Sequence, residues 1–213
     1  MNRILLGIIK RNIKPIKSAK DRAFVELYSM KLREGDIAID CGANVGKVSA
    51  HWCESGATVY AFEPNPHAFK ILEEKLAGRP KAHCFQKAVL DQNDKVKLYY
   101  HLASDENELR WSTGSSLLRF KANVLQDKFA EVEALDLAEF VHALDQDVKI
   151  LKLDVEGVEC AILRKLIESE MHMRIEHIFV ETHENQAPEL QADTDELRAL
   201  IKSMNITNIN MNW

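Results

Sequence analysis

The stretch that decides the fold is Ile39-Asp40-Cys41-Gly42-Ala43-Asn44-Val45-Gly46, a D-x-G-x-N-x-G turn. It separates an apolar strand, predicted over 37–40, from a helix predicted over 45–54. Glycines in such a turn let the backbone approach a ligand closely, and the start of the following helix offers free N–H groups to a carboxylate or phosphate. The pattern therefore predicts a ligand-binding turn between a strand and a helix.

Strands and helices alternate on both sides of this turn. We expect further apolar strands over 58–62, 82–89, 148–153 and 175–181, and helices over 21–32, 158–169 and after Pro66. This alternation favours an α/β fold with a mainly parallel central sheet and helices on both faces. Alternating apolar residues at 96–100 and a strand over 129–134 predict an inserted β-hairpin, and Asp193 could cap a last helix before a short strand over 206–213.

Length and composition limit the class of protein. The chain has 213 residues, of which 46% are hydrophobic and 29% charged, as expected for one globular domain. We expect a basic N-terminal extension and helix over 1–34 and a catalytic domain over 35–213. The four cysteines form no C-x-x-C pair, which argues against a structural zinc site and favours free thiols in the cytoplasm. No apolar run approaches the ~20 residues of a membrane span.

Charge is distributed unevenly along the chain. Residues 1–22 carry a net charge of +6, whereas the rest carries −11. Nucleic-acid binding needs clustered Lys and Arg, so the acidic body argues against it. The apolar residues of 4–9 and the bases around them could lie on the anionic inner face of a membrane, and the alternative is that 4–9 pack on the domain.

Glu63 ends the second predicted strand, 23 residues after Asp40. An acid at this place accepts hydrogen bonds from the ribose hydroxyls of an adenosine ligand, and the alternative is a purely structural turn. A nicotinamide dinucleotide would require G-x-G-x-x-G, which Asp40 and Asn44 interrupt. The Asp40 carboxylate suits the ammonium group of S-adenosylmethionine better than a pyrophosphate, so this cofactor is favoured.

Four motifs together resemble the FkbM family of S-adenosylmethionine-dependent methyltransferases. They are IDCGANVGKVS (39–49), VYAFEPNPHAFKILEEKL (59–76), LKLDVEGVECAILRKL (151–166) and FVETHE (179–184). The resemblance implies a class I, Rossmann-like fold and O-methylation of sugars or other small natural products. It implies a cofactor site formed by Asp40, Gly42, Ala43, Asn44, Gly46, Glu63, Pro64, Gln86, Ala88 and Asp154. Class I folds usually close with a two-strand hairpin, and here the last strand could be missing or come from a partner copy in a homo-oligomer.

Charged residues follow one of the predicted buried strands. Lys152, Asp154 and Glu156 stand at the carboxyl end of an apolar strand, where open α/β sheets bind ligands. Burying an unpaired charge costs free energy, so the presence of three charged residues here needs a physical explanation. One interpretation is an ion pair of Lys152 that caps the strand. The other is catalytic and places Asp154 near the sulfonium or the acceptor hydroxyl.

His183 is the candidate general base, because its ordinary pKa of ~6.5 suits proton transfer near neutral pH. The alternative is a plain surface histidine at a strand end. Asp154, Glu181 and His183 could instead hold a divalent metal that orients a sugar diol, which we consider the less favoured arrangement.

The inserted stretch 101–120 suggests where an acceptor binds. Arg110, Trp111, Ser115, Ser116 and Arg119 suit the phosphate and ring of a nucleotide- or lipid-linked sugar, and the alternative is a solvated hairpin. The sequence thus predicts methyl transfer from S-adenosylmethionine to a hydroxyl of a glycan or small natural product, leaving S-adenosylhomocysteine. Two other functions stay open, an NAD(P)-dependent Rossmann oxidoreductase and a non-catalytic S-adenosylmethionine-binding module.

Overall fold

The structure, a computed structural model, describes residues 18–105, 112–119, 121, 123–186 and 188–212. The basic residues and apolar run expected to contact a membrane, as well as Arg110 and Trp111, lie outside these residues. Within the described part of the chain, no helix is both long and apolar enough to cross a membrane.

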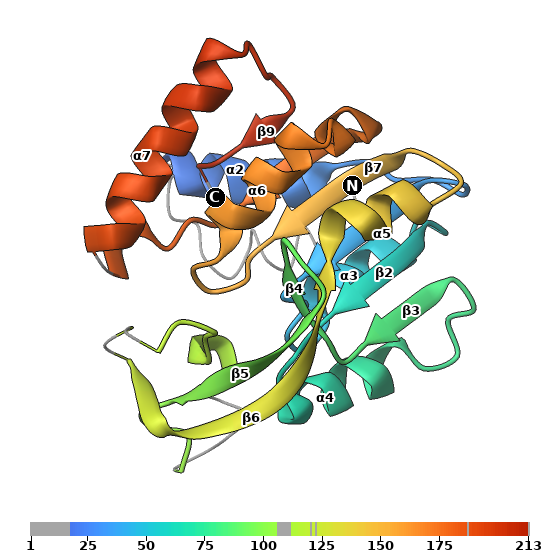
Figure 1. Cartoon of the computed structure of the whole chain (residues 1–213). Helices are drawn as coiled ribbons and strands as arrows, with labels where there is room; N and C mark the ends of the chain where they lie inside the picture. Colours follow the sequence, from blue (N-terminus) through green and yellow to red (C-terminus); the bar gives the residue numbers. More distant parts are fainter. Residues whose placement is uncertain (1–17, 106–111, 120, 122, 187, 213) are drawn as a thin grey trace.

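A parallel sheet forms the centre of the molecule, with the strand order β3-β2-β1-β7-β8-β9 (Figure 1). Its strands are β1 (Ile37–Cys41), β2 (Thr58–Phe62), β3 (Ala82–Phe85), β7 (Val148–Leu153), β8 (Ile175–Val180) and β9 (Ile209–Asn210). The chain order reverses between β1 and β7, and open α/β sheets bind ligands outside the carboxyl ends of the strands at such a switch point.

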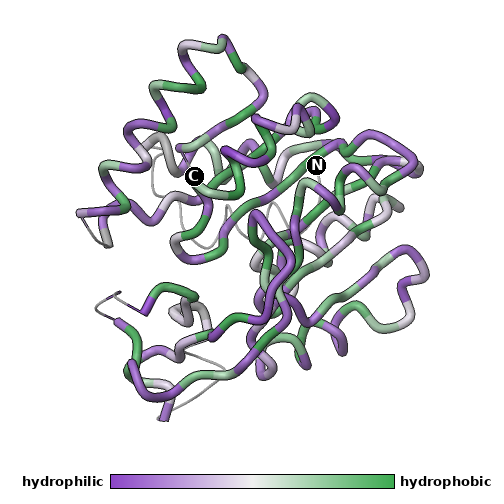
Figure 2. Tube along the Cα trace, viewed as in Figure 1, coloured by the Kyte–Doolittle hydropathy of each residue, from purple (hydrophilic) through white to green (hydrophobic). Residues whose placement is uncertain are grey.

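Helices cover both faces of this sheet, as predicted. They are α2 (Ala19–Ser29), α3 (Lys47–Cys53) and α4 (Pro66–Leu76) on one face, and α5 (Leu137–Ala143), α6 (Glu159–Glu168) and α7 (Pro188–Ser203) on the other. Successive side chains of a strand point to opposite faces, so Ile150 packs with Trp52 of α3 and Leu151 with Leu163 of α6. Figure 2 shows hydrophobic residues concentrated along the central strands.

A second sheet of three strands projects from the first beside α4 (Figure 1). It contains β4 (Ala88–Leu90), β5 (Asp94–His101) and β6 (Val124–Asp136) in the order β4-β6-β5. β5 and β6 pair antiparallel, which confirms the inserted hairpin. The single strand expected over 82–89 is wrong, because the chain leaves the central sheet after β3 and continues in the second sheet as β4.

Three short 3₁₀ helices complete the described elements: η1 (Ser112–Gly114), η2 (Met171–Arg174) and η3 (Glu184–Gln186). The predicted start of the last helix at Asp193 is wrong. α7 begins at Pro188, a residue that suits a first helical position, and Asp193 lies inside it with its carboxylate 2.7 Å from Arg164.

The two ends of the described chain pack on the sheet. Ala23 and Leu27 of α2 are buried in the core formed with α3, so this part of the predicted extension contributes to the domain core. At the other end, β9 pairs parallel with β8 through Ile178 and Ile209. Among the described residues, no antiparallel strand follows at this edge.

Candidate active site

The glycine-containing turn after β1 lies directly against the end of β7. A Cβ atom on Gly42 would approach the carbonyl oxygen of Asp154 to 1.8 Å, and φ of Gly42 is +75°. Both observations require glycine, because L side chains rarely adopt this φ and no atom fits in that space. The turn therefore holds the ends of β1 and β7 together at the predicted ligand-binding edge.

Glu63, at the end of β2, is held by two backbone N–H groups. The amide of Asn44 donates to Oε2 and that of Asn65 donates to Oε1, each at 2.8 Å. The residue is 5% exposed. Burial raises the pKa of Glu63 to about 7, although the two amide hydrogen bonds and the charge of Lys152 oppose this rise.

Lys152 is enclosed at the end of β7 by oxygen atoms. Its ammonium lies 3.2 Å from Asp40 and 3.2 Å from Asp154, and it donates to the carbonyl of Gly42 at 2.8 Å. Burial on its own lowers the pKa of Lys152, but the two carboxylates raise it above the ordinary value. Asp40 also accepts a hydrogen bond from Ser49 at 2.5 Å and is fully buried. Lys152 thus forms the strand-end ion pairs of the first interpretation.

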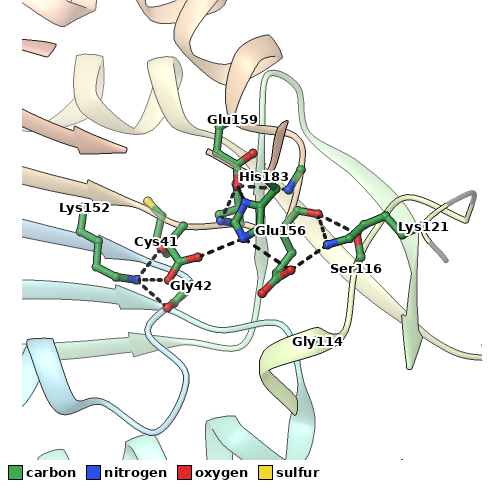
Figure 3. Close-up of polar contacts among 12 residues, drawn as sticks. Cys41, Gly42, Gly114, Ser116, Lys121, Lys152, Glu156, Glu159 and His183 are labelled. Carbon is green, nitrogen blue, oxygen red and sulfur yellow. Dashed lines mark hydrogen bonds and ion pairs between the residues drawn. The ribbon is translucent and has the colours of Figure 1, made fainter. Parts of the chain in front are cut away.

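His183, after β8, is buried and faces three carboxylates (Figure 3). Its Nδ1 lies 2.9 Å from Glu159, while its Nε2 lies 3.8 Å from Asp154 and 3.5 Å from Glu156. The interpretation as a plain surface histidine is therefore wrong. Burial lowers the pKa of His183, yet the carboxylates, Glu159 first, raise it above the ordinary value.

Glu159 also shapes the loop that carries two of these carboxylates. Its Oε1 accepts hydrogen bonds from the amides of Val155 at 3.0 Å and Gly157 at 3.1 Å, in addition to its contact with His183. One buried carboxylate therefore orients both the loop after β7 and the imidazole after β8.

Glu156 has an unusual backbone conformation, and it is held by residues of the insertion, which comprises β5, β6 and the segment between them (Figure 3). Its φ is +63°, which costs energy for a residue other than glycine. Its carbonyl accepts hydrogen bonds from the hydroxyl of Ser116 at 2.7 Å and the ammonium of Lys121 at 3.1 Å. Lys121, whose side chain is completely buried, also lies 2.7 Å from Oε2 of Glu156.

A cleft lies at this edge of the central sheet, between the sheet and the insertion. It is lined by Gly42, Asn44, Glu63, Pro64, Lys87, Ala88, Val89, Leu98, Ser112, Ser115, Ser116, Leu117, Asp154, Val155 and Glu156. The lining residues and His183 come from the loops after β1, β2, β7 and β8, from the segment 87–89 that enters β4, from β5, and from the connection between β5 and β6.

Several predicted site residues do not line the cleft. Asp40 and Lys152 form a buried ion pair outside the cleft lining, so the Asp40 carboxylate is not exposed to a cofactor ammonium. Gln86 lies outside the lining, although its neighbours Lys87 and Ala88 belong to it. Ala43 is buried, and a Cβ on Gly46 would lie 2.6 Å from Leu72, so both residues shape the turn from inside.

The predicted metal-binding set also differs from the observed cluster. Atoms of Asp154, Glu156 and His183 that could bind a metal lie within 4.8 Å of one another, and Glu181 does not belong to this group. Glu181 instead uses its backbone N–H to bond the carbonyl of Leu153.

Sequence reasoning missed the roles of Glu159, Lys121 and Ser112. Glu159 stood in the quoted motif three residues after Glu156, and a buried acid in the first turn of α6 was a usable signal. Nothing in the local sequence marks Lys121 or Ser112, since their partners are 35 and 68 residues away. Arg119 was predicted to contact an acceptor, but it is exposed and does not line the cleft.

Comparison with known proteins gives a consistent family. The family model described as the methyltransferase FkbM domain matches residues 40–206. Hexuronic acid methyltransferase AglP of Haloferax volcanii is 24% identical over 188 residues, covering 87% of this chain and 71% of that protein. The 31-O-demethyl-FK506 methyltransferase FkbM of Streptomyces tacrolimicus is 39% identical over 66 residues, covering 28% of this chain and 25% of that protein.

Solved structures are more distant. A SAM-dependent methyltransferase from Thiobacillus denitrificans, solved with S-adenosyl-L-homocysteine, has 10% sequence identity and a TM-score of 0.37, covering 79% of this chain and 51% of that one. A TM-score below 0.5 does not establish a shared fold, so the family assignment rests on the sequence matches. The family match spans most of the chain and includes the turn after β1, Glu63 and the loop after β7. The chain therefore belongs to the methyltransferase FkbM domain family and is an S-adenosylmethionine-dependent methyltransferase.

Proposed function

We propose that this protein transfers the methyl group of S-adenosylmethionine to a hydroxyl oxygen of a sugar, a glycan or another small natural product. The observation that carries the proposal is the orientation of His183. Its Nδ1 is fixed on a buried carboxylate, and its Nε2 faces the two cleft-lining acids Asp154 and Glu156. This is the arrangement that a general base requires at the end of a ligand cleft.

The cofactor site fits the adenosine part of the methyl donor. Each oxygen of Glu63 accepts one amide hydrogen bond and keeps a second lone pair, so the carboxylate can accept from two ribose hydroxyls. Ala88, Val89 and Leu98 offer an apolar wall to the adenine. When bound, the sulfonium supplies an electrophilic methyl group. The turn at Gly42, adjacent to Asp154, would direct that end of the donor toward the catalytic residues.

Proton transfer is assigned to His183. Glu159 accepts the Nδ1 proton, which leaves Nε2 as the basic atom, facing the cleft-lining acids Asp154 and Glu156. Nε2 of His183 would take the proton of the acceptor hydroxyl as its oxygen receives the methyl group and the donor leaves as a neutral thioether. The imidazolium is then stabilised by Glu159, Asp154 and Glu156. Lys152 acts at a distance, by keeping the charge of Asp154 in place.

We propose that this step needs no metal. The cluster of Asp154, Glu156 and His183 could bind a divalent cation, but the ammonium of Lys121 already lies 2.7 Å from Glu156. A second cation at that oxygen would be repelled by the buried ammonium. Lys121 therefore favours proton transfer by histidine over a metal-bound acceptor.

Acceptors can be tested with radiolabelled S-adenosylmethionine and a small panel. The panel contains p-nitrophenyl β-D-glucuronide, p-nitrophenyl β-D-glucoside, UDP-glucuronic acid and 31-O-demethyl-FK506, chosen because the two relatives are named as methyltransferases of a hexuronic acid and of 31-O-demethyl-FK506. We expect methyl transfer to a sugar hydroxyl, retained in EDTA and lost in His183→Ala. Intact S-adenosylhomocysteine binding with no transfer to any member contradicts the acceptor class. Loss of activity in EDTA, restored by Mg²⁺, contradicts the metal-free step.

A further inference from the structure

Two serines of the insertion bond to the loops that surround Glu63. The side-chain amide of Asn44 donates to the hydroxyl of Ser112 at 3.0 Å, and that of Asn65 donates to the hydroxyl of Ser115 at 3.2 Å. Both serines are buried and line the cleft. The turn that carries them belongs to η1 and the residue after it, so the insertion contacts the loops after β1 and β2 at once.

These two asparagines are also the residues whose backbone N–H groups hold the Glu63 carboxylate. Each carboxylate oxygen is thus connected through one asparagine to one serine. The φ of Asn44 is +47°, a left-handed backbone conformation that asparagine adopts at lower cost than most residues. Asn65 uses its side-chain oxygen to accept from His67 and Ala68 at the start of α4, which leaves its NH₂ group to bond Ser115.

We propose that Ser112 and Ser115 are positioning residues for the methyl donor, because by holding Asn44 and Asn65 they fix the Glu63 carboxylate in the orientation that receives the two ribose hydroxyls. The inference rests on the proposed cofactor site. A carboxylate oriented before binding loses less freedom when the ligand arrives, and such preorganisation appears as affinity. The insertion would then contribute to cofactor binding through the asparagines.

The first experiment measures S-adenosylhomocysteine affinity by calorimetry. Ser112→Ala and Ser115→Ala should each weaken binding roughly 2–10-fold, as expected for one lost hydrogen bond, and the double variant more. Ser104→Ala is the matched control. Ser104 is a buried serine of the same insertion, 1% exposed, that does not line the cleft, and its hydroxyl has no hydrogen-bond partner among the described residues. Its change should leave affinity unaltered.

A double-mutant cycle separates positioning from direct contact. In a Glu63→Gln background, the serine changes should cost less than twofold, because the charge they orient is gone. Equal losses in both backgrounds would mean that the serines touch the ligand themselves, and would overturn the proposal. If the double serine variant is not folded at the temperature of the measurement, the single serine variants, compared in the unmodified protein and in Glu63→Gln, distinguish positioning from direct contact.

The pH dependence of affinity gives an independent readout. Weaker amide hydrogen bonds to Glu63 should move the midpoint of this dependence to higher pH in Ser112→Ala and Ser115→Ala, while the charges of Lys152 and Asp154 that face Glu63 stay the same. An unchanged midpoint contradicts the inference. If Glu63→Gln itself leaves the affinity intact, the proposed cofactor site is wrong, and this inference is wrong with it.

Discussion

The two halves of the cleft are built in different ways. On the cofactor side, Asn44, Glu63 and Asn65 come from two consecutive loops, and backbone N–H groups hold the acid. On the catalytic side, His183 and Glu156 are held by the side chains of residues distant in sequence, such as Lys121. Backbone groups follow from the fold of a short segment, whereas side-chain pairs form only once distant segments have packed.

This difference predicts that the two halves can be disabled separately. Changes on the catalytic side should slow turnover without affecting donor binding, and changes on the cofactor side should weaken donor binding first. The following experiments test that separation, beginning with the largest expected effect.

Replacing His183 by alanine should lower kcat by ~10²–10⁴-fold, because no other described group is placed to take the proton in the same way. The affinity for S-adenosylhomocysteine should change little. In the unmodified protein, activity should fall as the pH drops through the pKa of His183, which its carboxylate neighbours raise above 6.5, since only the neutral imidazole accepts a proton. Near-normal turnover of the variant would move the role to Asp154 or Glu156.

Replacing Glu63 by alanine should weaken S-adenosylhomocysteine binding by ~1–3 kcal/mol, because charge-assisted hydrogen bonds to the ribose are lost. Calorimetry measures this directly. Once the donor is saturating, kcat should stay close to that of the unmodified protein. A large loss of kcat at saturation would show that the two halves are coupled after all.

The smallest expected effect is the change of S-adenosylhomocysteine affinity with pH. Because burial raises the pKa of Glu63 to about 7, the carboxylate that we propose as the ribose acceptor is lost as the pH falls through that value. S-adenosylhomocysteine affinity should therefore rise up to roughly tenfold between pH 6 and pH 8 and then level off. Glu63→Gln is the control and should show no such rise. A flat profile in the unmodified protein would place the Glu63 pKa well below this range.

The geometry of the proposed cofactor side was largely predictable from the sequence. The turn at Gly42 and the acid at Glu63 lie in local patterns whose geometry follows from strand, turn and helix succession. His183 and Asp154 were found for the same reason, since both follow predicted strands. The family of methyltransferases followed from these motifs and is confirmed by the family match.

The rest depended on packing. Asp40 was predicted to face the cofactor, and Lys152 was expected either to serve the reaction or to form an ion pair at the strand end. The cost of burying their charges is met by pairing them with each other. The alternation of apolar and polar residues along a strand does not show which charged side chains will pair. Lys121 reaches Glu156 only because β5 and β6 bring the insertion back over the end of β7. Sequence periodicity predicts the hairpin but not which of the nearby side chains reach the site.

The left-handed backbone of Glu156 has a consequence for protein engineering. A search for heat-tolerant variants would favour glycine or asparagine at this position, because both adopt positive φ at lower cost. Such a replacement would relieve the backbone strain, but it would remove the carboxylate that lies between Lys121 and His183 and leave the buried ammonium of Lys121 without this ion pair. At residue 156, relief of backbone strain is thus opposed both by a buried ion pair and by the proposed chemistry.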